Sequence, residues 1–184
     1  MSISKELFLS ILSMDAYNRG YGAGVSDPSA EDDTGLGVTN SQETYFIGGA
    51  RIVADSSILV DANGNRLDQS AGFYSISYKM VAGEEIAGLS VGDTIISYRG
   101  TDNPDPLTWG DGASDVWQGW ITGAGIPGSQ SHLALDFFKA VTGDDALMRQ
   151  QGDVILTGHS LGGGLAGLVA ALSGDKAVLF DNMP

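Results

Sequence analysis

The sequence predicts an α/β fold in which a mostly parallel sheet carries helices on both faces. Residues 153–157, 163–173 and 177–180 follow strand, helix and strand patterns in turn, and a glycine-rich turn separates the first two. The 184 residues, 42% of them hydrophobic, are enough for one hydrophobic core. Because no internal repeat or linker interrupts them, we expect one domain spanning 1–184.

The upstream segments continue this alternation of helices and strands. Apolar residues at near-helical spacing predict an amphipathic helix from Ile3 to Tyr17. They are Ile3, Leu7, Ile11, Met14 and Ala16. Residues 20–37 are rich in Gly, Asp and Ser, which indicates a surface loop. Strands are expected at 50–60, 72–81 and 93–99, and a further helix is expected at 131–141.

Asp61 to Asn65 has the pattern of a tight turn between strand-like runs. It contains Asn63-Gly64, and Asn-Gly is the strongest short hairpin signal. Oxygen-bearing side chains at alternate positions also resemble a calcium loop, but Gly64 comes two residues too early for the EF-hand pattern. A plain hairpin turn is therefore favoured over a calcium site.

Composition excludes several classes of function. The 9 basic and 23 acidic residues give a formal net charge of -14, which repels nucleic acid and anionic lipid headgroups. A neutral reacting group or a bound cation such as calcium suits that charge better. The absence of cysteine rules out disulfides, thiolate zinc sites and thiol nucleophiles.

Targeting signals are not visible in this segment. The apolar run from Leu7 to Met14 is short and lacks both a basic cluster before it and a cleavage site after it, so it does not predict a signal peptide. We find no apolar run long enough to predict a transmembrane segment. Any export would use a signal outside these residues.

The strongest functional pattern is Gly158-His159-Ser160-Leu161-Gly162, which matches G-x-S-x-G between an apolar strand and a small-residue helix. A serine on such a turn is held in strained backbone geometry, and flanking glycines let neighbouring backbone pass closely. The hydroxyl of Ser160 is then exposed as a nucleophile, as in α/β-hydrolases. The amide of Leu161, at the helix N-terminus, points toward a developing oxyanion. The alternative is a glycine-rich turn without chemistry.

Two motifs together resemble the fungal-type (class 3) lipases and related secreted bacterial lipases. ISYRGT at 96–101 precedes LTGHSLGG at 156–163, in the order and at a spacing similar to that family. The resemblance covers residues 72–184. It implies that Thr101 supplies an oxyanion-hole amide beside that of Leu161.

The resemblance also implies a lid at residues 102–126, between the two motifs. All three tryptophans, Trp109, Trp117 and Trp120, lie there, which suits a flap with one apolar side. Tryptophans that anchor a core helix are the alternative. No cofactor is required for the chemistry.

The same region offers a candidate calcium site. Asp111 and Asp115 are four residues apart and would share one helical face, where a cation relieves their repulsion. The related bacterial lipases hold a lid calcium at a comparable place, and Asp102 is a further possible ligand. A solvated acidic face is the alternative.

A complete catalytic triad is not visible. The triad order places a histidine base after the serine, but the only histidines are His132 and His159. A structural role is favoured for His132 and a packing role for His159. Asp181 follows the next strand and is a possible acid, although the resemblance places the acid further on. We therefore expect an N-terminal portion of the catalytic domain, incomplete at its C-terminus and completed by the remainder of the protein, either in the same chain or as a second chain.

These observations favour a serine esterase or lipase that cleaves lipid or other acyl esters through an acyl-enzyme at Ser160. The alternative is a non-catalytic lipase-like module that binds calcium or lipid and lacks the base. Export from a bacterial cell is expected from the acidic, cysteine-free composition and the resemblance.

Overall fold

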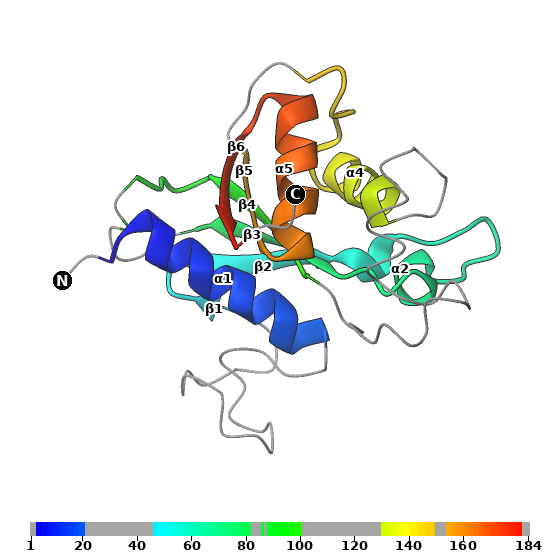
Figure 1. The fold of residues 1–184 in the computed structure, drawn as a ribbon, viewed down its shortest axis with the longest axis horizontal. Helices are drawn as coiled ribbons and strands as arrows, with labels where there is room; N and C mark the ends of the chain where they lie inside the picture. Colours follow the sequence, from blue (N-terminus) through cyan, green and yellow to red (C-terminus); the bar gives the residue numbers. More distant parts are fainter. Residues whose placement is uncertain are drawn as a thin grey trace.

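The computed structural model describes residues 3–20, 46–81, 86, 88–100, 130–149 and 154–181. The helices in these ranges are α1 (Lys5–Gly20), α2 (Leu67–Ser70), α4 (Gln130–Thr142), α5 (Leu161–Ser173) and the 3-10 helix η1 (Ser56–Ile58). The strands are β1 (Phe46–Ile47), β2 (Ala50–Asp55), β3 (Ser75–Met80), β4 (Thr94–Tyr98), β5 (Val154–His159) and β6 (Lys176–Phe180). Figure 1 shows their arrangement.

The described strands form one mixed sheet in the order β1-β2-β3-β4-β5-β6. Neighbours from β1 to β4 pair antiparallel, whereas β4, β5 and β6 pair parallel. Consequently β2, β4, β5 and β6 run in one direction, and β1 and β3 run in the other. The parallel pair β5 and β6 is joined by α5, as a crossover connection requires. The predicted α/β-hydrolase-like fold class is confirmed, with antiparallel pairing concentrated in its N-terminal part.

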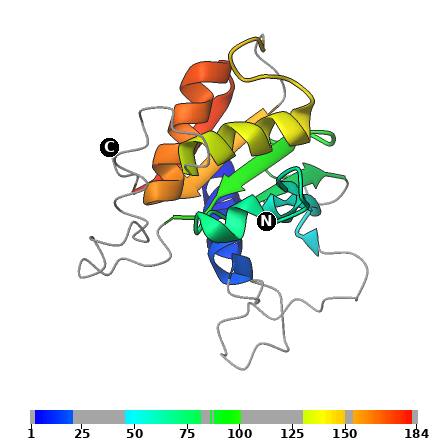
Figure 2. The same cartoon turned by 90° about the vertical axis from the view of Figure 1, so that its right-hand side faces the viewer.

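Helices cover both faces of the sheet, as predicted. Neighbouring strand residues point to opposite sides, so apolar strands present a hydrophobic surface on each face. Ile95 and Ile155 belong to a core under α1, whereas Ile96 and Leu156 belong to a core under α4 and α5. Figure 1 shows α1 apart from α4 and α5, and Figure 2 shows α4 crossing beside α5. Among the described helices, none is both long and apolar enough to cross a membrane.

The predicted helices and strands are present, but the predicted apolar face of the first helix is largely wrong. Leu7 and Met14 are each 52% exposed, so they lie outside the core. Of the other predicted residues, Ala16 is buried and Ile11 packs against the core while partly buried. The buried apolar residues of α1 are Phe8, Leu9, Leu12 and Ala16. The helix is apolar on more than one side, so its periodicity alone could not select the face that the sheet covers.

Polar contacts also attach α1 to the sheet. The Ser13 and Thr157 hydroxyl oxygens lie 3.2 Å apart, and the Tyr78 hydroxyl donates to Asp15 Oδ2 at 2.7 Å. All four side chains belong to buried residues. Because hydrogen bonds are directional, these contacts fix the rotation and position of α1 more closely than apolar packing alone.

The Asp61–Asn65 segment forms the plain turn that was favoured. Val60 and Arg66 make an isolated antiparallel bridge around it, and Gly64 has a φ of 83°. The Asp61 carboxylate accepts hydrogen bonds from the Asn63 N–H, the Asn65 N–H and the Asn65 side-chain amide, at 2.8, 2.8 and 2.9 Å. Hydrogen-bond donors within the turn itself therefore satisfy both oxygens of this carboxylate.

Asp61→Asn is expected to lower the melting temperature at pH 7 but not in strong acid. The side-chain and backbone hydrogen bonds from Asn65 lower the pKa of Asp61 in the folded chain. A depressed folded pKa stabilises the fold above the unfolded pKa, and this contribution is lost as pH falls through the folded pKa. The difference from wild type should therefore begin to shrink as pH falls below about 4 and should vanish only below the lowered pKa of Asp61. Thermal melts across pH 2–8 would measure it, and an undiminished difference at about pH 2.5 would contradict this account.

Candidate active site

Ser160 lies at the sharp turn between β5 and α5, with φ 56° and ψ −125°. This is a backbone region that residues with a Cβ rarely adopt, so the surrounding structure must hold it. The Ser160 N–H donates to the Phe180 carbonyl of β6 at 3.0 Å, and its carbonyl accepts from Gly164 at 3.1 Å. The strained geometry expected of a nucleophile-bearing turn is therefore present, fixed by β6 on one side and by α5 on the other.

The glycines on either side of Ser160 have a steric reason. A Cβ on Gly158 would lie 2.8 Å from the Tyr98 carbonyl oxygen of β4, and a Cβ on Gly162 would collide with the same oxygen. No side chain fits where backbone approaches so closely. The turn at 158–162, called the elbow below, is thus packed directly against the end of β4.

Leu161 begins α5, so its N–H has no acceptor within the helix. The residue is only 7% exposed, and the helix dipole favours negative charge at this end. The amide that was predicted to bind an oxyanion is therefore at the start of a helix that directly follows the candidate nucleophile.

The second predicted oxyanion residue, Thr101, lies outside the described residues, but its neighbour Gly100 is described. A Cβ on Gly100 would lie 2.7 Å from the His159 carbonyl oxygen. Gly100 is therefore in close contact with the elbow. Thr101 is the next residue in the chain, so its backbone nitrogen is bonded to the carbonyl carbon of Gly100.

Buried side chains hold the two chain segments that flank 101–129. Arg99 Nη2 donates to the Gly72 carbonyl at 3.1 Å, and Gln130 Nε2 donates to the Ala71 carbonyl at 2.9 Å. Arg99 also lies over the Tyr74 ring, 5.4 Å from its centroid. Both segments are thus attached to consecutive carbonyls of one turn, which fixes where residues 101–129 leave and rejoin the described structure.

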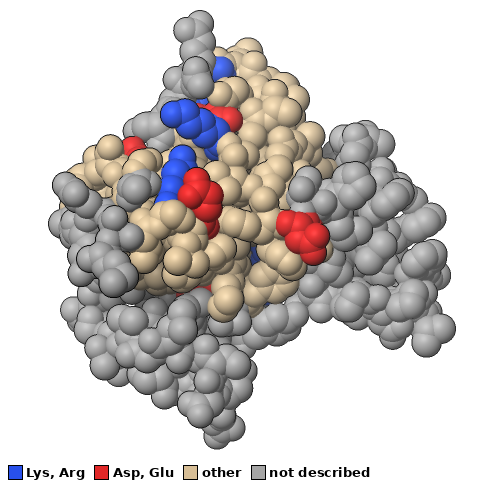
Figure 3. All heavy atoms as spheres, turned by 60° about the vertical axis from the view of Figure 1, so that its left-hand side comes forward, with Lys and Arg blue, Asp and Glu red and all other residues tan. Residues whose placement is uncertain are grey.

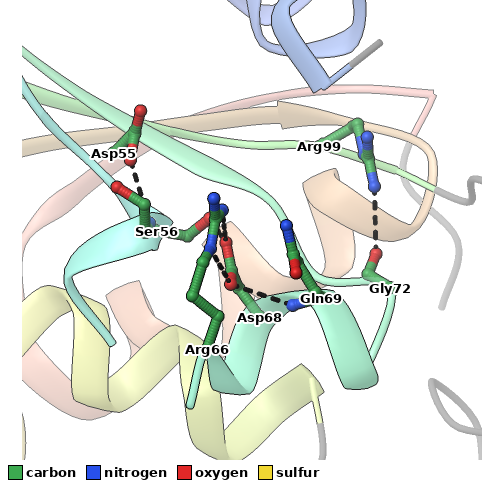
Figure 4. A network of polar contacts seen from close by, with 8 residues as sticks. Asp55, Ser56, Arg66, Asp68, Gln69, Gly72 and Arg99 are labelled. Carbon is green, nitrogen blue, oxygen red and sulfur yellow. Dashed lines mark hydrogen bonds and ion pairs between the residues drawn. The ribbon is translucent and has the colours of Figure 1, made fainter. Parts of the chain in front are cut away.

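That turn is itself braced by the buried carboxylate of Asp68 in α2, shown in Figure 4. Arg66 Nε donates to Oδ1 at 3.0 Å, and the Ser56 hydroxyl donates to Oδ2 at 2.8 Å. The Gln69 N–H donates to Oδ1 at 2.9 Å. A buried carboxylate with several charge-assisted hydrogen bonds gives a rigid base for the Arg99 contact.

His159 is more exposed than its predicted packing role implies. Its ring packs edge-on against Tyr17, with centroids 5.7 Å apart, yet 47% of the side chain is accessible. Nδ1 lies 3.3 Å from the Tyr17 hydroxyl, and Nε2 lies 4.0 Å from the Asp181 carboxylate. Asp181 follows β6 with a φ of 44° and is almost fully exposed. The described structure thus places a tyrosine, a histidine and a carboxylate in a row beside Ser160.

A cavity of about 430 Å³ opens next to this row. It lies between α1 and the ends of β5 and β6 and is mostly apolar. Its lining residues are Ser10, Ser13, Met14, Tyr17, His159 and Phe180. On the face of the molecule drawn in Figure 3, the acidic and basic side chains of the described residues form small groups among uncharged residues.

The structural role that was favoured for His132 stays a prediction. His132 lies on α4, where Nε2 is 3.8 Å from Asp136 Oδ2 one turn later. No contact between His132 and Ser160 occurs within the described part of the chain.

Several predicted site residues lie outside the described ranges. They are Thr101, Asp102, Asp111 and Asp115, together with the predicted lid at 102–126 and its tryptophans. Within the residues that the structure does describe, no group of three or more His, Cys, Asp or Glu could hold a metal ion. The calcium site and the lid therefore stay predictions.

Tyr17 is the site residue that sequence reasoning missed. It is separated from His159 by 142 residues, and no motif marks it. Its position at the end of an amphipathic helix is the only sequence signal, and that signal does not indicate which element the helix end meets.

Comparison with known families adds an independent finding. A family model described as Phospholipase-like, Tle-like phospholipase domain, matches residues 57–183, which is well over half of the chain. No curated protein matches the chain. The family match supports a lipase-like domain and does not single out the fungal-type class 3 branch.

Proposed function

Because this chain belongs to the Tle-like phospholipase domain family, we propose that it contributes the nucleophile and oxyanion hole of a serine lipase that cleaves acyl esters of phospholipids. The family supports lipid ester hydrolysis in general terms. The finer assignment rests on one observation: Ser160 has φ 56° and ψ −125° on a strand-to-helix turn, directly before a helix N-terminus. That arrangement suits attack on a carbonyl carbon.

In the proposed reaction, Ser160 Oγ attacks the acyl carbonyl carbon and loses its proton to a base. The N–H groups of Leu161 and Thr101 stabilise the oxyanion of the tetrahedral intermediate. Collapse of the intermediate expels the alcohol, which takes the proton from the base, and leaves an acyl-enzyme. Water, deprotonated by the same base, then attacks the acyl carbon. Collapse of this second intermediate breaks the bond to Ser160 Oγ and releases the fatty acid, and the base returns its proton to Oγ.

The base is the part of the proposal that the described residues do not supply. The sequence contains His132 and His159 only, and His132 is paired with Asp136. We propose that a histidine not contained in these 184 residues acts as the base. Calcium bound by Asp102, Asp111 and Asp115, and secretion, are further proposals that follow the resemblance to secreted lipases.

Covalent labelling with a fluorophosphonate tests the nucleophile. We expect wild type, assayed together with the polypeptide that carries the proposed base, to gain one phosphonyl group, with the modified peptide containing Ser160. The probe reacts with serines that a base and an oxyanion hole activate. Intact-mass spectrometry followed by peptide mapping would measure it. Ser160→Ala should abolish labelling completely.

Ser10→Ala is the matched control, because Ser10 lines the adjacent cavity but is not part of the elbow. It should be labelled as wild type is. Labelling that survives Ser160→Ala would overturn the assignment of the nucleophile. Absence of labelling in wild type that still binds phospholipid vesicles would favour the alternative, a non-catalytic lipid-binding module.

A further inference from the structure

The first helix reaches the elbow although it lies outside the segment that matches the family. That segment begins at residue 57, whereas Tyr17 is near the end of α1. The Tyr17 hydroxyl lies 3.3 Å from His159 Nδ1 and 3.4 Å from the His159 carbonyl oxygen, to which it donates. Tyr17 therefore contacts both the side chain and the backbone of the residue that precedes Ser160.

The same hydroxyl also touches the end of β4. A Cβ on Gly100 would collide with the Tyr17 hydroxyl, so Gly100 and this oxygen are in direct contact. Burial raises the pKa of Tyr17, while the Arg99 charge and a hydrogen bond from the Gly100 backbone oppose that rise. The hydroxyl is therefore neutral near pH 7 and can both donate and accept.

Several contacts further along α1 hold the helix that carries Tyr17 on the sheet. Tyr78 donates to the buried carboxylate of Asp15, and Ser13 contacts Thr157 on β5. The buried apolar residues of α1 also pack on the sheet, so the position of the helix does not depend on any one of these contacts.

We propose that Tyr17 is a positioning residue for ester hydrolysis, which holds Gly100 against the elbow and so keeps the Leu161 amide in place to bind the oxyanion. This inference rests on the proposed function. Tyr17 acts through its contacts with Gly100 and His159 and does not touch the reacting atoms. The N-terminal helix is thereby part of the catalytic apparatus.

Tyr17→Phe is expected to lower kcat for a soluble acyl ester by about 10- to 100-fold, with KM nearly unchanged. The oxyanion amides act mainly in the transition state, so a small displacement affects kcat more than substrate binding. The phenylalanine ring keeps the edge-on packing against His159. We therefore expect the melting temperature to change little.

Tyr78→Phe is the matched control, because it also removes a tyrosine hydroxyl that contacts α1. It should lower the melting temperature more than Tyr17→Phe, since it removes a donor from the buried Asp15, but it should leave kcat close to wild type. Equal losses of kcat in the two variants would overturn the proposal, because they would show a general loosening of α1.

A readout that does not depend on turnover separates this inference from the proposed function. The ¹⁵N chemical shift of His159 Nδ1 reports its hydrogen bond to Tyr17. It should change in Tyr17→Phe and stay unchanged in Tyr78→Phe. An unchanged shift in Tyr17→Phe would overturn the proposal even in an active enzyme, whereas a changed shift without ester hydrolysis in wild type would count against the proposed function alone.

Discussion

Ser160→Gly is expected to abolish ester hydrolysis and, compared with Ser160→Ala, to raise the melting temperature. Loss of the nucleophile should reduce kcat by about a millionfold. The φ of 56° and ψ of −125° at this position cost a residue with a Cβ about 1–3 kcal/mol, and glycine removes most of that cost. The greater freedom of glycine in the unfolded chain offsets about 0.5–1 kcal/mol of the gain.

Comparing Ser160→Ala with Ser160→Gly separates the effect of losing the nucleophile from the effect of backbone strain at this position. Ser160→Ala should be equally inactive but keep the strained Cβ, so it should melt about 2–4 °C below Ser160→Gly. Product release from a phospholipid substrate and thermal melts at one pH would measure both quantities. Equal or reversed melting temperatures would show that the elbow stores no strain, and hydrolysis at close to the wild-type rate in either variant would exclude Ser160 as the nucleophile.

Gly162→Ala is expected to destabilise the chain by about 3 kcal/mol or more, with loss of ester hydrolysis. The added Cβ would collide with the Tyr98 carbonyl oxygen and would lie 2.7 Å from the Arg99 carbonyl carbon. Both atoms belong to backbone at the end of β4, so no rotamer change relieves the contact. Relief requires the elbow and β4 to separate, which also moves the residues before Thr101.

Gly167→Ala is the matched control on the same helix. Its Cβ would meet only the Leu179 Cδ1 atom at 3.2 Å, and this is the end of a flexible side chain. Alanine also gains up to about 1 kcal/mol of helix propensity over glycine. Urea denaturation should therefore find Gly167→Ala close to wild type. If Gly167→Ala lowered the free energy of unfolding as much as Gly162→Ala, the effect would come from helix propensity or general crowding in α5 and not from contact with β4.

The elbow and its neighbourhood were predictable from the sequence because their determinants are local. Glycines two positions either side of Ser160, an apolar strand before it and a small-residue helix after it are all within one short segment. The structure has β5, the turn and α5 at these places. The α4 helix was equally predictable, since Leu133, Phe137 and Phe138 form one stripe that packs into the core.

The antiparallel half of the sheet was only partly predictable. Strands at β2, β3 and β4 follow from their residues, but their pairing directions do not. The strand predicted for 50–60 ends at Asp55, where the Asp55 carboxylate accepts from the Ser57 N–H and starts a 3-10 turn. Local hydrogen bonding by Asp competes with strand pairing in a way that an apolar pattern does not reveal.

By itself, the sequence determined where the elbow lies, which residues build it and that a sheet with helices on both faces surrounds it. Only the tertiary structure decided which side of α1 is buried, because Leu7 and Phe8 are both apolar and the sheet covers only the Phe8 side. It also brought Tyr17 to His159 across 142 residues. Local patterns reflect interactions between near neighbours in the chain, whereas such contacts depend on how whole elements pack, which no single segment encodes.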